Sequence, residues 1–242
     1  MLFRNLSTYV SEARRARREF ATDCSSAQLF KGFSRWRRTL DPQRGPIDVE
    51  LPWLTFGSID YLAARLSSRS RVFEFGSGGS TLFFASRAGS VHSIEHDASW
   101  AHRVERAVGA KGLTNSTVRV VAPVAETRMT ECDPADPDLY ATADPTYRSC
   151  SFRNYATTID SYPDGHFDVV LIDGRSRPSC VKHAASKVAV GGLLVLDNAE
   201  RDYYGRTNDL LTPEKWLRRP FYGPGPCLPH FWLTVVWQKR AA

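Results

Sequence analysis

The sequence has no long apolar segment. Nowhere in its 242 residues does an apolar run approach the roughly 18 residues that a membrane-spanning helix needs. The positive charges near the N-terminus are not followed by an apolar stretch, so we expect neither a transmembrane segment nor a secretory signal. Internal repeats and low-complexity tracts are also missing. An apolar content of 42% is ordinary for a globular protein, and the length suits one α/β domain with additions.

Cysteine is sparse and dispersed. The five cysteines are Cys24, Cys132, Cys150, Cys180 and Cys227, and none of them belongs to a C-x-x-C pair. An odd, scattered set argues against a disulfide framework and against a zinc site. Reduced thiols are typical of the cytosol, so we expect a cytoplasmic protein.

The most informative stretch is RVFEFGSGGST, residues 71–81. Its first five residues are mostly large and apolar, which predicts a short buried strand. Three glycines then remove β-carbons where the backbone must turn, and two hydroxyl residues can start a helix. Strand, glycine turn and helix start is the arrangement that holds a ligand against backbone N–H groups. The turn and helix start comprise Gly76, Ser77, Gly78, Gly79, Ser80 and Thr81.

A second strand is expected over residues 90–95, SVHSIE, and it ends in an acid. Glu95 follows Glu74 by 21 residues. An acid at the tip of the second strand, about 20 residues after the first, can accept hydrogen bonds from the ribose of a nucleoside. We therefore expect a nucleoside ligand across the first two strand tips.

Further strands alternate with helical segments along the chain. The expected strands are residues 118–121, 167–173, 193–196 and 231–237, and the expected helices include residues 98–108 and 179–190. This alternation predicts an α/β fold with a doubly wound, mostly parallel sheet, closed by an antiparallel edge hairpin at the C-terminus. Ligands bind such sheets at the carboxyl ends of the strands, where the sequence places Asp173 and the pair Asp197-Asn198.

The motifs EFGSGGST, SIEHD, FDVVLIDG and GGLLVLDN, in this order, resemble class I S-adenosylmethionine (SAM) dependent methyltransferases over about residues 55–240. The resemblance implies their seven-stranded Rossmann-like sheet. It is greatest to small O-methyltransferases, including a family of bacterial predicted enzymes. The implied function is methyl transfer from SAM to a hydroxyl of a small molecule or sugar.

The resemblance also implies roles for individual residues. Glu95 would take the ribose hydroxyls, and His96 would flank the adenine. Asp173 and Asp197 would be the catalytic acids. The methionine end of SAM would be held by Glu74, Gly76, Ser77, Gly78 and Gly79, with Ser80 or Thr81 reaching its carboxylate.

Three oxygen-bearing side chains match the Mg²⁺ site of some O-methyltransferases: Asp173, Asp197 and Asn198. The lysine that those enzymes often carry three residues after the first acid is Ser176 here. Arg175 and Arg177 cannot act as a base, because a guanidinium stays protonated, but they could hold a carboxylate or phosphate of the substrate. The alternative is that Asp197 and Asn198 only cap the loop after their strand.

Two segments are expected to determine which acceptor molecule is methylated. Residues 1–45 form a basic helical extension of the domain at residues 46–242, with an apolar face of Phe3, Leu6, Val10, Ala13 and Phe20. That face could pack on its own domain or on a second subunit in a homodimer, and the arginines around it could be solvated or meet an anionic partner. Residues 123–165 form a long insertion, expected to be a substrate lid. Candidate ligand contacts are Arg148, Arg153, Asn154 and Tyr155, together with Trp53 and Phe56 before the first strand.

Other functions remain as alternatives. An aminopropyl transferase would need a second acid shortly after Asp173, which is missing. A nucleic-acid (RNA) methyltransferase fits the basic N-terminus, but the Asn/Asp-Pro-Pro-aromatic stretch of base-amino methylation is replaced by residues 173–176, DGRS. A non-catalytic binding module with the same fold is the third alternative.

Overall fold

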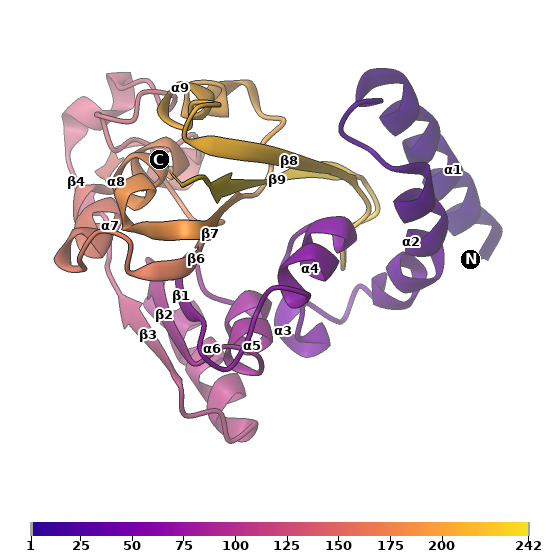
Figure 1. Ribbon diagram of the computed structural model, residues 1–242, viewed down its shortest axis with the longest axis horizontal. Coiled ribbons are helices and arrows are strands. Elements are labelled where there is room, and N and C mark those ends of the chain that lie inside the picture. Colours follow the sequence, from indigo (N-terminus) through magenta and orange to yellow (C-terminus); the bar gives the residue numbers. More distant parts are fainter. Residues whose placement is uncertain (1, 242) are drawn as a thin grey trace.

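A seven-stranded sheet forms the centre of the molecule (Figure 1). The computed structural model describes residues 2–241, with side chains from residue 6 onward. The strands are β1 (Arg71–Phe75), β2 (Ser90–Glu95), β3 (Ser116–Val120), β6 (Phe167–Ile172), β7 (Val188–Leu196), β8 (Trp216–Gly223) and β9 (Trp232–Lys239), in the order β3-β2-β1-β6-β7-β9-β8. The first five run parallel, and the β8–β9 hairpin is antiparallel to them through β9. The predicted doubly wound sheet with a C-terminal edge hairpin is confirmed.

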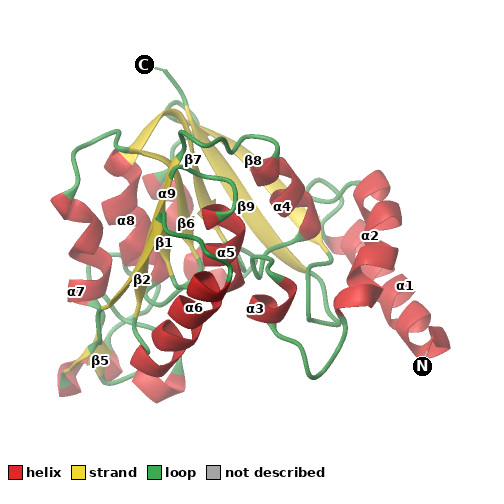
Figure 2. Ribbon diagram, turned by 90° about the horizontal axis from the view of Figure 1, so that it is seen from below, coloured by secondary structure: helices red, strands yellow, loops and turns green. Residues whose placement is uncertain are grey.

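Helices cover both faces of this sheet (Figure 2). On one face lie α4 (Phe56–Ala63), α5 (Gly79–Ala85) and α6 (Ala98–Ala110), and on the other α7 (Arg153–Ala156), α8 (Arg177–Lys187) and α9 (Thr207–Leu210). Because both faces are covered, the central strands are almost wholly apolar, and Phe73, Val170 and Leu194 are fully buried. Within residues 2–241, every helix is too short or too polar to cross a membrane.

The boundary between α8 and β7 differs from the prediction. A helix was expected over residues 179–190, stopped by the glycines that follow. In the structure α8 ends at Lys187, and Val188 already pairs with Phe167 of β6. The amino group of Lys239 donates to the carbonyls of Ala185 (3.1 Å) and Val188 (2.8 Å) at the end of the helix. A distant lysine and strand pairing therefore end the helix before the glycines are reached.

The N-terminal extension consists of two helices, α1 (Leu2–Glu19) and α2 (Ser26–Thr39). Leu6 and Val10 were expected on the packed face of α1, but they are 44% and 37% exposed. The buried face instead carries Tyr9 and Ala16, because Tyr9 packs between α2 and the end of the β8–β9 hairpin. Phe3, assigned to the same face, lies outside the described side chains.

Hydrogen bonds fasten both N-terminal helices to the loop between β8 and β9. Arg15 donates to the carbonyl of Phe231 (3.2 Å), and the Trp36 indole donates to the carbonyl of Leu228 (2.8 Å). Figure 1 shows α1 and α2, the helices that carry these two donors, beside the end of the β8–β9 hairpin. The position of this loop thus depends on the extension.

The insertion packs along α8. It contains β4 (Val124–Ala125), β5 (Cys150–Ser151) and three short 3₁₀ helices, η1 (Thr127–Glu131), η2 (Pro145–Tyr147) and η3 (Thr157–Ser161). The ion pairs Lys182–Asp138 and Lys187–Asp164 (2.8 Å) connect it to α8, and His183 of α8 lies 2.8 Å from a carboxylate oxygen of Asp160. The remaining short helices are α3 (Pro46–Val49) and η4 (Asp202–Tyr204).

Candidate active site

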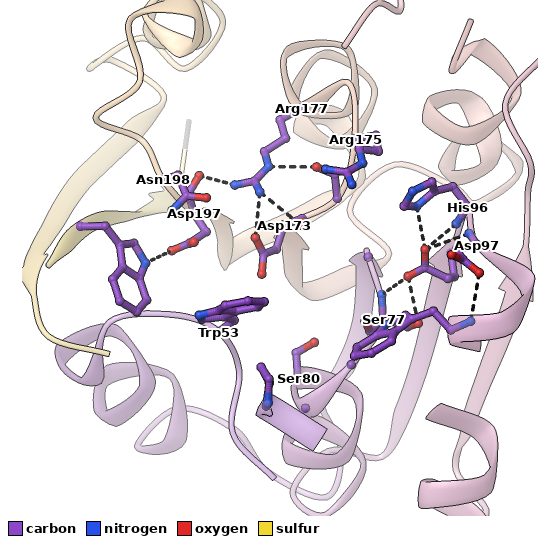
Figure 3. Close-up of a pocket in the computed structure, with 18 of the residues that line it drawn as sticks. Trp53, Ser77, Ser80, His96, Asp97, Asp173, Arg175, Arg177, Asp197 and Asn198 are labelled. Atoms are coloured by element: carbon purple, nitrogen blue, oxygen red, sulfur yellow. Dashed lines mark hydrogen bonds and ion pairs between the residues drawn. The ribbon is translucent and has the colours of Figure 1, made fainter. Parts of the chain in front are cut away.

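A cavity of about 550 Å³ opens at the carboxyl ends of the parallel strands (Figure 3). It lies where the strand order reverses, between β1 and β6, which is where open α/β sheets bind ligands. Its volume is in the range of small-molecule sites. Ten of the predicted site residues line it: Gly76, Ser77, Gly78, Gly79, Ser80, Glu95, His96, Asp173, Asp197 and Asn198. The structure thus brings together residues spread over more than half of the chain.

Two glycines of the first turn are required by close backbone approaches. Gly76 has a φ of +94°, and a β-carbon there would come within 3.1 Å of the Gly174 backbone. A β-carbon on Gly79 would lie 2.2 Å from the carbonyl oxygen of Leu51. The turn therefore lies directly between the tip of β6 and the segment after α3, which fixes the floor of the cavity.

Glu74 and Thr81 lie beneath this turn and not among the residues that line the cavity. The Thr81 hydroxyl donates to the Glu74 carboxylate and accepts from the N–H of Gly78 (3.1 Å). Ser93 donates to the same carboxylate (2.5 Å). Glu74 and Thr81 are both buried, so they support the turn from within the protein. Burial raises the pKa of Glu74 to about 7, although hydrogen bonds from Ser80, Ser93 and Thr81 oppose it.

Substituting Glu74→Gln is expected to remove a pH dependence of stability. Since the folded-state pKa of about 7 exceeds the ordinary 4.5, the stabilisation is complete below the unfolded pKa and lost as the pH rises through the folded one. The loss in the wild type corresponds to roughly 3 kcal/mol. Urea unfolding between about pH 5 and pH 8 measures it. A glutamine variant that loses stability as steeply as the wild type would show that another group is responsible.

Glu95 holds the loop that follows β2. Its carboxylate accepts from the Ser77 N–H (3.0 Å) and hydroxyl (3.1 Å), and from the N–H groups of His96 (2.8 Å) and Asp97 (3.1 Å). Burial raises the pKa of Glu95, but the hydrogen bonds from His96, Ser77 and Asp97 outweigh it and leave the pKa below its ordinary value. The group is therefore an ionised acceptor at neutral pH, and a ligand hydroxyl can replace the Ser77 hydroxyl on it.

A buried arginine joins the tips of β6 and β7. The Arg177 guanidinium lies 3.0 Å from a carboxylate oxygen of Asp173 and donates to the carbonyls of Gly174 (3.0 Å) and Asp197 (2.5 Å). The Asp197 carboxylate accepts from the Trp232 indole (2.9 Å) and from a threonine hydroxyl of the same strand (2.6 Å). Asp173 faces the cavity with 22% of its side chain exposed, whereas Asp197 is 2% exposed.

The two carboxyls differ in what they can do chemically. Burial raises the pKa of Asp173, and Arg177, Arg201 and Arg175 lower it in part. Burial and repulsion by Asp173 raise the pKa of Asp197 well above its ordinary value. Asp173 is the more accessible proton acceptor of the pair. Asp197 is hydrogen-bonded into the sheet and is placed to orient its neighbours.

No protein-family model matches the sequence, and neither does any curated protein. Solved structures do match. A candidate O-methyltransferase from Klebsiella pneumoniae has a TM-score of 0.56 at 17% identity, over 86% of this chain and 96% of that one. The O-methyltransferase TomG from Streptomyces achromogenes, solved with SAM, has a TM-score of 0.56 at 16% identity, over 86% and 98%. An rRNA methylase from Streptococcus thermophilus has a TM-score of 0.53 at 12% identity, over 82% and 98%.

The chain has the class I methyltransferase fold. The five parallel strands and the C-terminal hairpin are the sheet that the sequence motifs predicted. At these identities the similarity shows the methyltransferase fold alone, so the substrate must be argued from the cavity itself.

The methyltransferase fold does not bring a metal site with it here. Within residues 2–241, no three His, Cys, Asp or Glu side chains come together in a way that could hold a metal ion. Of the expected Mg²⁺ ligands, Asp173 is ion-paired with Arg177, and one carboxylate oxygen of Asp197 accepts two hydrogen bonds. A second positive charge beside this guanidinium would be repelled, so the residues present do not fit Mg²⁺.

Of the six further residues predicted to contact a ligand, only one lines the cavity. Trp53 lines the cavity (Figure 3), but Phe56 is buried under Arg35. Tyr155 is fully buried, with its hydroxyl next to Gly174. The other three insertion candidates, Arg148, Arg153 and Asn154, are not among the lining residues.

Some lining residues were missed by sequence reasoning. They come from the start of α6, the insertion, the loop after β7 and the C-terminal hairpin: Trp100, Tyr147, Arg201, Leu228, His230 and Trp232. Trp100 had a detectable signal, because Asp97 caps its helix and so places the indole three residues later against Ser77. The others depend on long-range packing.

Proposed function

We propose that this protein is a SAM-dependent methyltransferase that methylates a hydroxyl group of a small molecule or sugar. The observation that carries the proposal is which residues line the same cavity. The glycine turn and Glu95, suited to a nucleoside, line the same space as Asp173, suited to take a proton. The matching O-methyltransferase structures support the same reaction class.

In this proposal the residues of the chain position the reactants and accept one proton. Bound SAM supplies a methyl group on a positively charged sulfur, and S-adenosylhomocysteine (SAH) leaves as the carbon bonds to the acceptor oxygen. Glu95 binds the ribose, and the N–H groups of the glycine turn hold the methionine end. Asp173 takes the hydroxyl proton, and Arg177 fixes the orientation of its carboxylate. Alignment of the two reactants supplies most of the remaining acceleration.

The proposed reaction has no metal step. Arg177 already supplies the positive charge between the tips of β6 and β7 that Mg²⁺ would otherwise supply. The acceptor hydroxyl is then activated by Asp173 and not by a Lewis acid.

Substituting Glu95→Ala tests the cofactor half. The variant is expected to bind SAM and SAH roughly 100-fold more weakly, because charged hydrogen bonds to the ribose and the anchor of the Ser77 loop are both lost. Isothermal titration calorimetry measures the change. The exposed Glu105→Ala on α6 is the matched control and should retain wild-type affinity. Equal affinities in the two variants would contradict the assignment of Glu95 to the ribose. A wild type that binds neither SAM nor SAH would contradict the proposed function.

An RNA acceptor is a second candidate, supported by the basic helices α1 and α2 and by the rRNA methylase among the similar structures. A methyl-transfer assay with total RNA beside a small-molecule pool separates the two. The homodimer, an anionic partner for α1 and α2, and the lid role of the insertion stay predictions.

A further inference from the structure

A second chamber adjoins the cavity and shares part of its lining. This chamber has a volume of about 320 Å³ and shares Gly174, Arg175, Arg177 and Arg201 with the first one. Its other walls are residues 142–145 of the insertion and the tyrosines of η4. The acceptor side of the site is therefore larger than a single hydroxyl requires, and its shared border consists mainly of arginines.

The positive charges of the three arginines on this border are not equally balanced by nearby carboxylates. Arg177 is buried and paired with Asp173, and Arg175 pairs with Asp144 (2.8 Å). Arg201 donates to the Tyr203 hydroxyl (3.1 Å), but no carboxylate of the described chain, residues 2–241, lies within ion-pair distance of it. Hence the border carries one more positive charge than its acids neutralise.

Arg175 also has an unsatisfied donor. Its Nε–H is buried and has no hydrogen-bond acceptor, although its terminal nitrogen is paired with Asp144. A buried donor without a partner costs free energy that an added oxygen acceptor would recover. Arg201 and Arg175 also lower the pKa of Asp173, against the effect of burial.

We infer that the methyl acceptor carries an anionic oxygen group, a phosphate or a carboxylate, that binds between Arg201 and Arg175 in the second chamber while its hydroxyl faces Asp173. This assignment rests on the proposed function, since it names the substrate class of the same site. A guanidinium presents paired donors that match both oxyanions in geometry. The hydroxyls of Tyr203 and Thr142 line the chamber and add neutral hydrogen-bonding groups for the same ligand.

Calorimetry with inorganic phosphate and with acetate tests the anion site on the SAH-saturated protein. Arg201→Gln is compared with Arg106→Gln, a change at an exposed arginine on α6 outside both chambers. Arg201→Gln is expected to weaken anion binding roughly 10- to 100-fold, the effect of losing charge-assisted hydrogen bonds, while Arg106→Gln leaves it unchanged. Preference for phosphate or for acetate identifies the group. A wild type that binds neither anion, or equal binding by the two variants, overturns the inference.

The methyl-transfer assay gives the second readout. Sugar phosphates and sugar acids are compared with the matching neutral sugars, and Arg201→Gln is expected to raise KM for the anionic acceptor at least tenfold with little change in kcat. Equal turnover of the neutral sugars would also overturn the inference. SAH affinity is measured in the same samples. A wild type that does not bind SAH would count against the methyltransferase proposal. A wild type that binds SAH but no anion would count only against the anion site.

Discussion

Asp173→Asn is expected to lower kcat by roughly 10²- to 10⁴-fold, the usual contribution of a positioned general base. The amide is isosteric with the carboxylate but cannot take the hydroxyl proton. Asp173 takes no part in the hydrogen bonds that hold the Glu95 loop, so SAH affinity should stay near the wild-type value. Single-turnover methyl transfer and calorimetry, carried out on the same preparation, measure the two quantities.

The pH profile provides the second readout of this variant. Because burial raises the pKa of Asp173 above its ordinary value, the wild-type rate should increase with pH as the carboxyl loses its proton. That ascending limb should be missing in Asp173→Asn. The surface change Asp164→Asn at the foot of the same strand is the control and should keep it. Full activity in the asparagine variant would exclude Asp173 as the base and favour a non-catalytic role for this side chain.

Arg177→Met is expected to lower the free energy of unfolding by about 3–5 kcal/mol, because it leaves the Asp173 carboxylate and three carbonyls without the donor they share. Methionine fills much of the same volume, so the loss reports on the charge and hydrogen bonds. Urea unfolding measures the change. Arg106→Met on the exposed side of α6 should be nearly neutral. A loss below about 1 kcal/mol would mean that water replaces the guanidinium between the strand tips.

The part of the cavity that we propose binds SAM could be predicted from the sequence because it is local. Gly76 to Ser80 and Glu95 each follow directly from a strand tip, and parallel strands bring their tips to one edge. The same reasoning placed Asp173 and Asp197 in the cavity. It could not tell which residues turn inward. Thr81 belongs to the same motif as Ser80 but hydrogen-bonds under the turn to Glu74.

The part of the cavity that we propose holds the methyl acceptor is formed by contacts between segments that are distant in the sequence. Arg201 reaches the cavity through the path of the loop after β7, and His230 and Trp232 reach it through the hairpin. Neither path leaves a periodic pattern in the sequence. Lys239 shows the same limit for secondary structure, since it ends a helix 52 residues before it in the chain, at Lys187. The glycines after residue 190 were expected to end the helix, but Val188 already pairs with Phe167 of β6.

The attachment of α1 and α2 to the 224–231 loop has a consequence for how this protein can diverge. Leu228 and His230 form part of the cavity wall, and hydrogen bonds from Trp36 and Arg15 hold the loop at Leu228 and Phe231. A small tilt of the helix pair would reshape the mouth of the site while Gly76 to Glu95 stayed still. Residues that do not line the cavity can therefore alter the shape of its mouth, with the glycine turn and Glu95 left intact.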